Sequence, residues 1–229
     1  MCVVSILRNN HNNKIINYLG SLARQNYSNY QVVLVNEGSD QSVEKNIEEL
    51  IFLEYPELKE KMTVIGNPQE RSSFGSKHKA ISEHCHEDEV VVDLDVEDEL
   101  VGSQVLRLFN ALYQQHPDTW LIYSNSLHVN DVDREVKKGF SSDLNPTSFI
   151  THQVQFETQK ISHLRTFRRK LYGKVREEEF KDKDGSVHFR QVAVGDFLLY
   201  TALAELSGYN RIMFVDEPNI KHKPTDVSP

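Results

Sequence analysis

Five acidic side chains follow directly on three valines in the stretch VVVDLDVEDEL, residues 90–100. The valines predict a buried strand, because short β-branched runs are typical of parallel sheets. The acidic residues are Asp93, Asp95, Glu97, Asp98 and Glu99. Like charges this close repel one another unless a cation lies among them. The stretch therefore predicts either a solvated acidic turn or a site for a hard divalent cation, which prefers carboxylate oxygens.

The elements that must position these carboxylates alternate between strand and helix patterns. Apolar runs predict strands at 3–7, 31–35, 61–66, 89–95, 120–124 and 211–218. Helical spacing of apolar residues predicts helices at 15–23, 42–55, 75–85, 103–116 and 196–208. Ser103 is the expected N-cap of the fourth helix, residues 161–175 are also expected to be helical, and 128–145 to form a hairpin or surface loop. This alternation predicts an α/β fold with a mostly parallel sheet and helices on both faces.

Four of the predicted strands end in polar residues. These ends are residues 8–10, 36–39, 67–71 and 93–98. The carboxyl ends of parallel strands meet at one edge of the sheet, where α/β proteins bind their ligands. The coincidence of four polar strand ends favours a ligand site over a solvated turn.

Length and composition restrict the class of protein. The 229 residues fit one domain, 1–229, and the net charge of −8 makes nucleic acid an unlikely partner. Two cysteines, Cys2 and Cys85, imply no disulfide framework and favour a reducing compartment. The apolar N-terminal run is too short for a signal peptide or a membrane span, so we expect a soluble, cytoplasmic protein.

Four motifs occur in an order that resembles a known family. They are SLARQNYSNYQVVLVNEGSD (21–40), VVVDLDVEDEL (90–100), KISHLRTFRRKLY (160–172) and GDFLLYTALAELSG (195–208). In this order they resemble the family-2 glycosyltransferases of GT-A fold, over about residues 3–227. The likeness is greatest to a branch with an HLRTF run, as found in some large viruses and bacteria. The resemblance implies a nucleotide-binding half at about 1–100 and an acceptor half at about 101–229.

The activity implied by the resemblance is transfer of a sugar, with inversion, from a nucleotide-diphosphate sugar to an acceptor hydroxyl. A UDP-sugar is the expected donor, and Mn²⁺ or Mg²⁺ the expected cofactor, because the leaving diphosphate develops negative charge. The acceptor is a glycan or another hydroxyl compound. A partner domain or a second copy of the chain is also compatible with the resemblance.

The family pattern assigns roles to the acidic residues of the first half. Asp95 corresponds to a residue that faces the ribose or the metal, and Glu97 to a metal ligand that is Asp in the family. The alternative pair Asp93 and Asp95 lies on one face of the strand. Glu37 corresponds to an acidic residue that binds the nucleotide.

Further residues are assigned to the nucleotide, the acceptor and the chemistry by the same pattern. Leu7 and Asn9 correspond to nucleotide contacts, and Arg71 and Lys77 bracket the position of a basic contact. His163 and Arg165 are expected at the acceptor or the diphosphate, which suits the planar guanidinium group. Asp196 corresponds to the catalytic base, although an acidic N-cap is the simpler alternative. His222 is either an added metal ligand or an exposed tail histidine.

Two other classes of function compete with this interpretation. A nucleotidyltransferase is disfavoured, because the loop LRNNHNNK (7–14) contains no glycine. A catalytically degenerate module that only binds a sugar or nucleotide stays open, because Glu37 and Glu97 replace aspartates of the family pattern.

Overall fold

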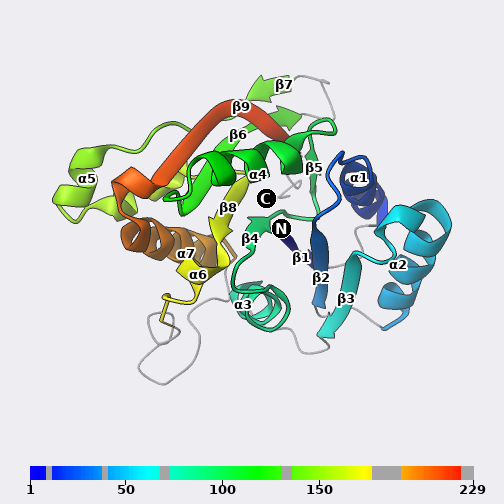
Figure 1. The fold of residues 1–229 in the computed structure, drawn as a ribbon. Helices are drawn as coiled ribbons and strands as arrows, with labels where there is room; N and C mark the ends of the chain where they lie inside the picture. The colour runs from blue at the N-terminus through cyan, green and yellow to red at the C-terminus, as the bar shows by residue number, and fades with distance from the viewer. Residues whose placement is uncertain (9–11, 38–40, 68–72, 130–135, 177–191, 223–229) are drawn as a thin grey trace, which may run out of the picture.

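The computed structural model describes residues 1–8, 12–37, 41–67, 73–129, 136–176 and 192–222 (Figure 1). The strands are β1 (Cys2–Arg8), β2 (Gln31–Glu37), β3 (Met62–Asn67), β4 (Val90–Asp93), β5 (Asp98–Leu100), β6 (Leu121–Val129), β7 (Val136–Lys138), β8 (Arg165–Arg168) and β9 (Ile212–His222). The helices are α1 (Asn12–Ala23), α2 (Gln41–Glu54), α3 (Ser73–His84), α4 (Val105–Gln115), α5 (Pro146–Ile150), α6 (Arg169–Tyr172) and α7 (Val192–Ser207). The strands and helices expected from the sequence are present, with one exception given below.

All the described strands belong to one sheet, in the order β3-β2-β1-β4-β8-β6-β9-β5, with β7 paired to β6. Strands β3, β2, β1 and β4 are parallel, as predicted. Strand β8 is antiparallel to both of its neighbours, β4 and β6. Strand β9 is parallel to β6, and β5 is antiparallel to β9. The sheet is therefore mixed, with its parallel part in the first half of the chain.

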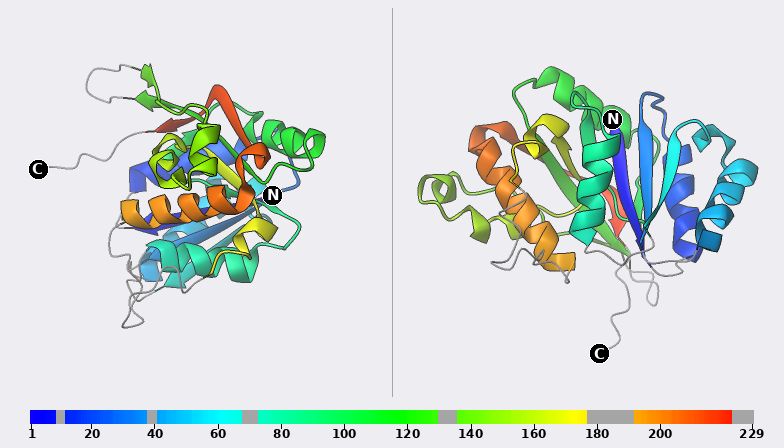
Figure 2. Two further views of the ribbon diagram at one scale, coloured as in Figure 1. Left: turned by 90° about the vertical axis from the view of Figure 1, so that its left-hand side faces the viewer. Right: turned by 90° about the horizontal axis from the view of Figure 1, so that it is seen from below.

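Helices cover both faces of the sheet, as predicted. Helices α1, α2 and α4 contribute Leu19, Ile51 and Phe109 to the core on one face. Helices α3 and α7 contribute Ile81 and Leu203 to the core on the other face. Figures 1 and 2 show α3 and α7 on the same side of the sheet, where the two helices contact each other. These two helices carry side chains to the carboxyl ends of β2 and β4.

The predicted helix at 161–175 is wrong. Residues Arg165–Arg168 form the central strand β8, and only Arg169–Tyr172 are helical. The Phe167 side chain is fully buried in the core on the face covered by α3 and α7. The Thr166 hydroxyl donates a hydrogen bond to the carbonyl of Ile122 on β6. Thr166 and Phe167 are residue types that favour strands, and β8 pairs with β4 on one side and β6 on the other. This pairing outweighs the helix propensity of the neighbouring arginines and lysine.

Two predicted helix starts also differ. Helix α4 begins at Val105, and its N-cap is Gln104, not Ser103. Helix α7 begins at Val192, so Asp196 lies inside the helix, one turn beyond its start. A capping role for Asp196 is therefore excluded, and its side chain is available for contacts across the fold.

The two cysteines are joined. Cys2 on β1 and Cys85, directly after α3, form a disulfide, although two cysteines alone imply no disulfide framework. The expectation of a reducing compartment loses that support, and the location of the protein stays a prediction. Among the residues that the structure describes, no helix is both long and apolar enough to cross a membrane.

Candidate active site

The polar strand ends converge, as expected from the sequence. Arg8, Glu37 and Asn67 are in register at the ends of β1, β2 and β3. The Glu37 carboxylate is buried and accepts a hydrogen bond of 2.8 Å from the hydroxyl of Ser76 on α3. The Leu7 side chain is packed in the core, so only its backbone is left for the predicted nucleotide contact. Asn9 and Arg71, also predicted at the nucleotide, lie outside the described residues.

Four charged side chains form what we call the ion-pair network: Lys77, Asp93, Arg165 and Asp196. Lys77 Nζ lies 2.9 Å from Asp93 Oδ2 and 3.1 Å from Asp196 Oδ1. Arg165 Nη2 lies 2.8 Å from Asp196 Oδ2 and 3.3 Å from Asp93 Oδ2. The hydroxyl of Tyr200 donates a hydrogen bond of 2.7 Å to Asp93. Two cations thus face two anions, and each cation contacts both.

Burial makes these contacts strong. The side chains of Lys77, Asp93 and Arg165 are 4%, 1% and 7% exposed, whereas that of Asp196 is 21% exposed. Burial would raise the pKa of Asp196, but the charges of Lys77 and Arg165 outweigh it and hold this pKa far below its ordinary value. Burial would lower the pKa of Lys77, but Asp196 and Asp93 outweigh it and raise this pKa. Lys77 and Asp196 are therefore both ionised at neutral pH.

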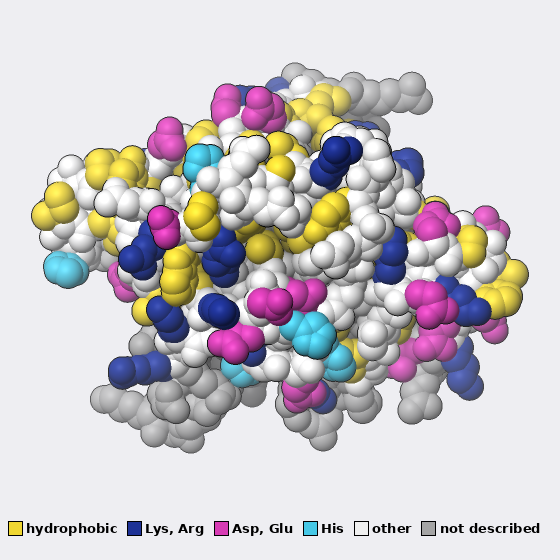
Figure 3. Space-filling view, viewed as in Figure 1, with side chains coloured by type: hydrophobic (Ala, Val, Ile, Leu, Met, Phe, Trp, Pro, Cys, Tyr) yellow, Lys and Arg dark blue, Asp and Glu magenta, His cyan; other side chains and the backbone are white. Residues whose placement is uncertain are grey.

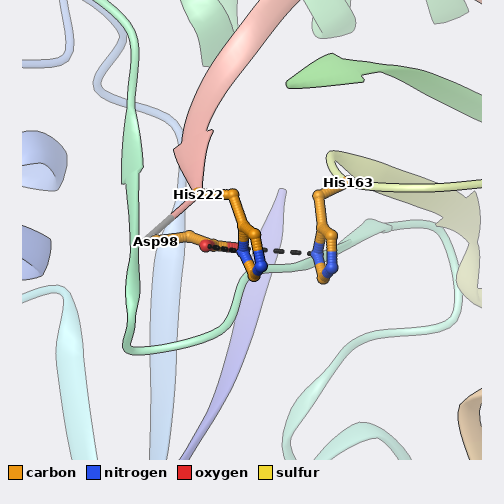
Figure 4. Close-up of side chains that lie close together, drawn as sticks. All are labelled: Asp98, His163 and His222. Carbon is orange, nitrogen blue, oxygen red and sulfur yellow. Dashed lines mark hydrogen bonds and ion pairs between the residues drawn. The ribbon is translucent and has the colours of Figure 1, made fainter. Parts of the chain in front are cut away.

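Asp98, His163 and His222 form a second group, which we call the histidine cluster (Figure 4). They come from β5, from the segment before β8 and from the end of β9. His222 Nδ1 lies 2.8 Å from Asp98 Oδ1, and the two imidazole rings are stacked with centroids 5.0 Å apart. One ligand atom of each residue lies within 4.8 Å of the others. Three residues from distant parts of the sequence thus point at one another.

The histidine cluster fits a divalent cation. Asp98 Oδ2 and His163 Nδ1 are buried and lack a hydrogen-bond partner among the described residues, although they lie only 3.3 Å apart. Buried polar atoms without partners are rare in native proteins, and a bound cation satisfies both. One carboxylate and two imidazoles suit a transition-metal ion such as Mn²⁺ better than Mg²⁺, which prefers oxygen ligands.

The electrostatics of the two histidines differ. Burial, together with the charge of Arg165, lowers the pKa of His163 to about 4. The hydrogen bond to Asp98 raises the pKa of His222 above its ordinary value. At neutral pH His163 is therefore neutral, which is the form of histidine that binds a metal.

The acidic residues predicted at the metal lie next to this cluster. Asp95 Oδ2 is 3.8 Å from His163 Nδ1. Glu97 Oε1 is 3.4 Å from Nζ of Lys14 on α1. The alternative pair of Asp93 and Asp95 is disfavoured, because Asp93 is committed to Lys77, Arg165 and Tyr200. A ligand role for Asp95 or Glu97 stays a prediction.

Sequence reasoning did not place Asp93 among the ion pairs, and it gave no role to Asp98 or to Tyr200, which contacts Asp93. Asp98 was recognised only as part of an acidic run. His222 was expected to be either an added metal ligand or an exposed tail histidine. It ends β9, whose pairing with β5 sets it opposite Asp98. The expected length of the last strand was the missing signal, because β9 extends four residues beyond the predicted end at 218.

The chain resembles known proteins in its three-dimensional structure but not in its sequence. No protein-family model matches the sequence, and no curated protein matches it. Among solved structures, TarS 1-349 of S. aureus is similar with a TM-score of 0.66 at 18% identity, over 97% of this chain and 60% of that chain. The same protein in complex with UDP-GlcNAc has a TM-score of 0.65 at 17% identity, over 98% of this chain and 58% of that chain.

A second neighbour is a mannosyltransferase, PcManGT from Pyrobaculum calidifontis, in complex with GDP-Man and Mn²⁺. Its TM-score is 0.61 at 15% identity, over 99% of this chain and 57% of that chain. These neighbours are glycosyltransferases of GT-A type, so the predicted fold is confirmed. The chain spans about three fifths of the length of the structures it matches. The chain therefore has the GT-A glycosyltransferase fold.

Proposed function

We propose that the protein is a metal-dependent glycosyltransferase that moves a sugar, with inversion, from a nucleotide-diphosphate sugar to an acceptor hydroxyl. A UDP-sugar is the donor we expect first, and a glycan is one acceptor class. The observation that carries the proposal is the position of the ion-pair network and the histidine cluster together at the strand ends of a GT-A fold. Donor binding supports it by analogy, because structural neighbours are in complex with UDP-GlcNAc and with GDP-Man and Mn²⁺.

The nucleotide occupies the ends of β1, β2 and β3 in this proposal. Glu37 is buried at the end of β2 and held by Ser76. Its carboxylate accepts hydrogen bonds from the base or the ribose. Lys77 and Arg165 supply positive charge for the diphosphate, and the planar fork of arginine suits phosphate oxygens.

Asp98, His163 and His222 would hold the metal, with Asp95 and Glu97 beside them. When bound, the cation stabilises the negative charge that develops on the leaving nucleoside diphosphate. Asp95, which lies between the cluster and the network, orients the donor.

Asp196 is the proposed base. It is the most exposed member of the ion-pair network and projects from α7 into the site. A carboxylate here takes the proton of the acceptor hydroxyl while the hydroxyl oxygen attacks the anomeric carbon. General-base catalysis of this kind contributes roughly 10²- to 10⁴-fold in rate.

The test is release of nucleoside diphosphate from UDP-, GDP- and dTDP-sugars with Mn²⁺. The proposal expects release from one donor by the wild type and a loss of about 100-fold or more in Asp196→Asn. Equal rates in the two proteins would contradict the role of Asp196, and no release from any donor would contradict an active transferase.

A catalytically degenerate binding module is the second candidate. The observation that favours it is the double ion pair of Asp196, because a carboxylate held by two cations is a weak base. Metal-dependent binding of a nucleotide sugar without any release of diphosphate is the result that distinguishes this module from the enzyme.

A further inference from the structure

We propose that Lys77 and Arg165 exchange partners: they hold Asp196 in the donor-free protein and turn to the diphosphate when the donor binds, which unmasks Asp196 for the acceptor hydroxyl. This inference rests on the proposed function and concerns the control of the same site. It resolves the conflict between the expected role of Asp196 as a base and the contacts that the structure gives it.

The geometry shows that Asp196 is masked. Each of its two carboxylate oxygens contacts a different cation, Oδ1 at 3.1 Å from Lys77 and Oδ2 at 2.8 Å from Arg165. Charge-assisted hydrogen bonds of this kind are about twice as strong as neutral ones. An acceptor hydroxyl that meets Asp196 in this state meets a carboxylate whose charge is already neutralised.

Asp93 makes the exchange feasible. It lies 2.9 Å from Lys77 and 3.3 Å from Arg165, and Tyr200 fixes it from the other side. When the cations leave Asp196, each keeps one buried anionic partner, so no buried charge is left alone. Asp93 is thus the permanent anchor of the network, and Asp196 the exchangeable partner.

Two further features point toward a ligand. Arg165 Nε is buried and has no hydrogen-bond partner among the described residues, so Arg165 has an unused donor. Asp196 is also the member that reaches solvent, with 21% of its side chain exposed against 4% for Lys77. An anion that enters the site therefore arrives on the side of Asp196 and competes directly with its carboxylate.

The reaction balances with this exchange. The acceptor O–H bond breaks and its proton passes to the freed Asp196 carboxylate. The acceptor oxygen forms a bond to the anomeric carbon, and the bond from that carbon to the diphosphate oxygen breaks. The electron pair leaves with the nucleoside diphosphate, where Lys77 and Arg165 face the added negative charge. The base thus becomes available only when the leaving group has occupied its cations.

Competition between two anions for the same cations has a measurable consequence. If Asp196 and the diphosphate compete, removal of the Asp196 charge strengthens diphosphate binding. Lys77 and Arg165 then have no ion pair with Asp196 to break before they contact the diphosphate. Isothermal calorimetry with UDP and with GDP, each at saturating Mn²⁺, should therefore give about tenfold tighter binding to Asp196→Asn than to the wild type, or about 1.4 kcal/mol. UMP and GMP, which lack the second phosphate, should gain much less.

A double-mutant cycle separates exchange from a simple effect of charge. In a Lys77→Gln background most of the gain from Asp196→Asn should disappear, because one of the contested cations is gone. An effect of removing a nearby negative charge through space would persist in that background. Asp216→Asn is the matched control, because Asp216 pairs with Lys138 at 2.6 Å on the surface and should leave nucleotide affinity unchanged.

The outcomes are distinguishable. Unchanged or weaker diphosphate binding in Asp196→Asn overturns the exchange, and so does an equal gain in both backgrounds. If Asp196→Asn does not fold, the Lys77→Gln variant is measured alone. Its affinity for UDP or GDP should fall about tenfold, without a matching fall for UMP or GMP. An equal loss of affinity for diphosphates and monophosphates, or no loss, overturns the proposal. If neither nucleotide binds any of the folded proteins, the proposed function itself fails.

Discussion

The ion-pair network and the histidine cluster lie side by side, yet they differ in how complete they are. In the network, each carboxylate pairs with both cations and Tyr200 donates a hydrogen bond to Asp93, whereas Arg165 Nε has no hydrogen-bond partner among the described residues. In the cluster, Asp98 Oδ2 and His163 Nδ1 face each other at 3.3 Å without a hydrogen bond. His163 and Arg165, two residues apart, supply one member to each group. One short segment therefore contributes a residue to each of the two groups.

The two groups therefore differ in what they contribute to the fold. The network joins α3, β4, β8 and α7 through ion pairs. The cluster brings one carboxylate and two imidazoles together, with one ligand atom of each within 4.8 Å of the others. On the face of the molecule shown in Figure 3, acidic and basic side chains are interspersed.

The largest expected effect is the loss of one member of the network. Asp93→Asn removes an anion that contacts both Lys77 and Arg165, and breaking a buried pair from one side costs about 3–5 kcal/mol. Urea unfolding measures this loss in the free energy of unfolding. Asp216→Asn breaks an exposed pair and should leave the free energy of unfolding nearly unchanged. Similar costs for the two variants would show that the network is not a stabilising unit.

The next effect is stabilisation of the cluster by metal. Mn²⁺ at about 100 times its dissociation constant should add about 2.7 kcal/mol to the wild type. His222→Ala should abolish the gain, and His86→Ala, which changes an exposed histidine, should retain it. Thermal unfolding with Mn²⁺ or with chelator measures both. An equal response of wild type and His222→Ala would place the metal elsewhere.

The metal-free cluster should also depend on pH. His163 has a pKa of about 4 in the fold, below its ordinary value near 6.5, so between these values the unfolded chain binds more protons than the folded one. The free energy of unfolding should therefore fall as the pH falls from 6.5 to 4, by up to about 1.4 kcal/mol per unit. His222, with a raised pKa, acts in the opposite direction above pH 6.5.

Urea unfolding at several pH values, in the presence of chelator, measures this slope. In His163→Gln the free energy of unfolding should depend less steeply on pH between 4 and 6.5, by an amount that corresponds to about one bound proton. If the variant keeps the slope of the wild type, another group is responsible for it, and His163 is not the neutral buried histidine of the structure.

The smallest expected effect concerns Glu97. Its contact with Lys14 is partly exposed, with side chains 24% and 29% exposed, so Glu97→Gln should change the metal-free stability by less than about 1 kcal/mol. The same variant in the Mn²⁺ experiment tests the sequence-based prediction that Glu97 is a ligand. A full Mn²⁺ response in Glu97→Gln, beside a lost response in His222→Ala, would assign the ion to the histidine cluster alone.

The parallel half of the fold was predictable because its signals are local. Short apolar runs such as 31–35, followed by polar turns and amphipathic helices, define β1 to β4 and their ligand-binding edge. Lys77, His163, Arg165 and Asp196 were predicted at the site, and the structure brings them together with Asp95. Their chemical roles remain predictions.

The remainder depends on contacts between distant segments, which no local pattern reports. Strand β8 was mistaken for a helix because its identity comes from β4 and β6 on either side. His222 and Asp98 meet only through the pairing of β9 with β5. The partners of Asp196, at distances in sequence of 31 and 119 residues, were equally invisible.

The most direct test of the central claim is calorimetric binding of UDP-GlcNAc and GDP-Man to the wild type, with Mn²⁺ and with chelator. The account predicts that one of the two binds, that binding requires Mn²⁺, and that His222→Ala loses it. Binding of neither donor, or equal binding with and without Mn²⁺, would contradict a metal-dependent nucleotide-sugar site at the edge of this sheet.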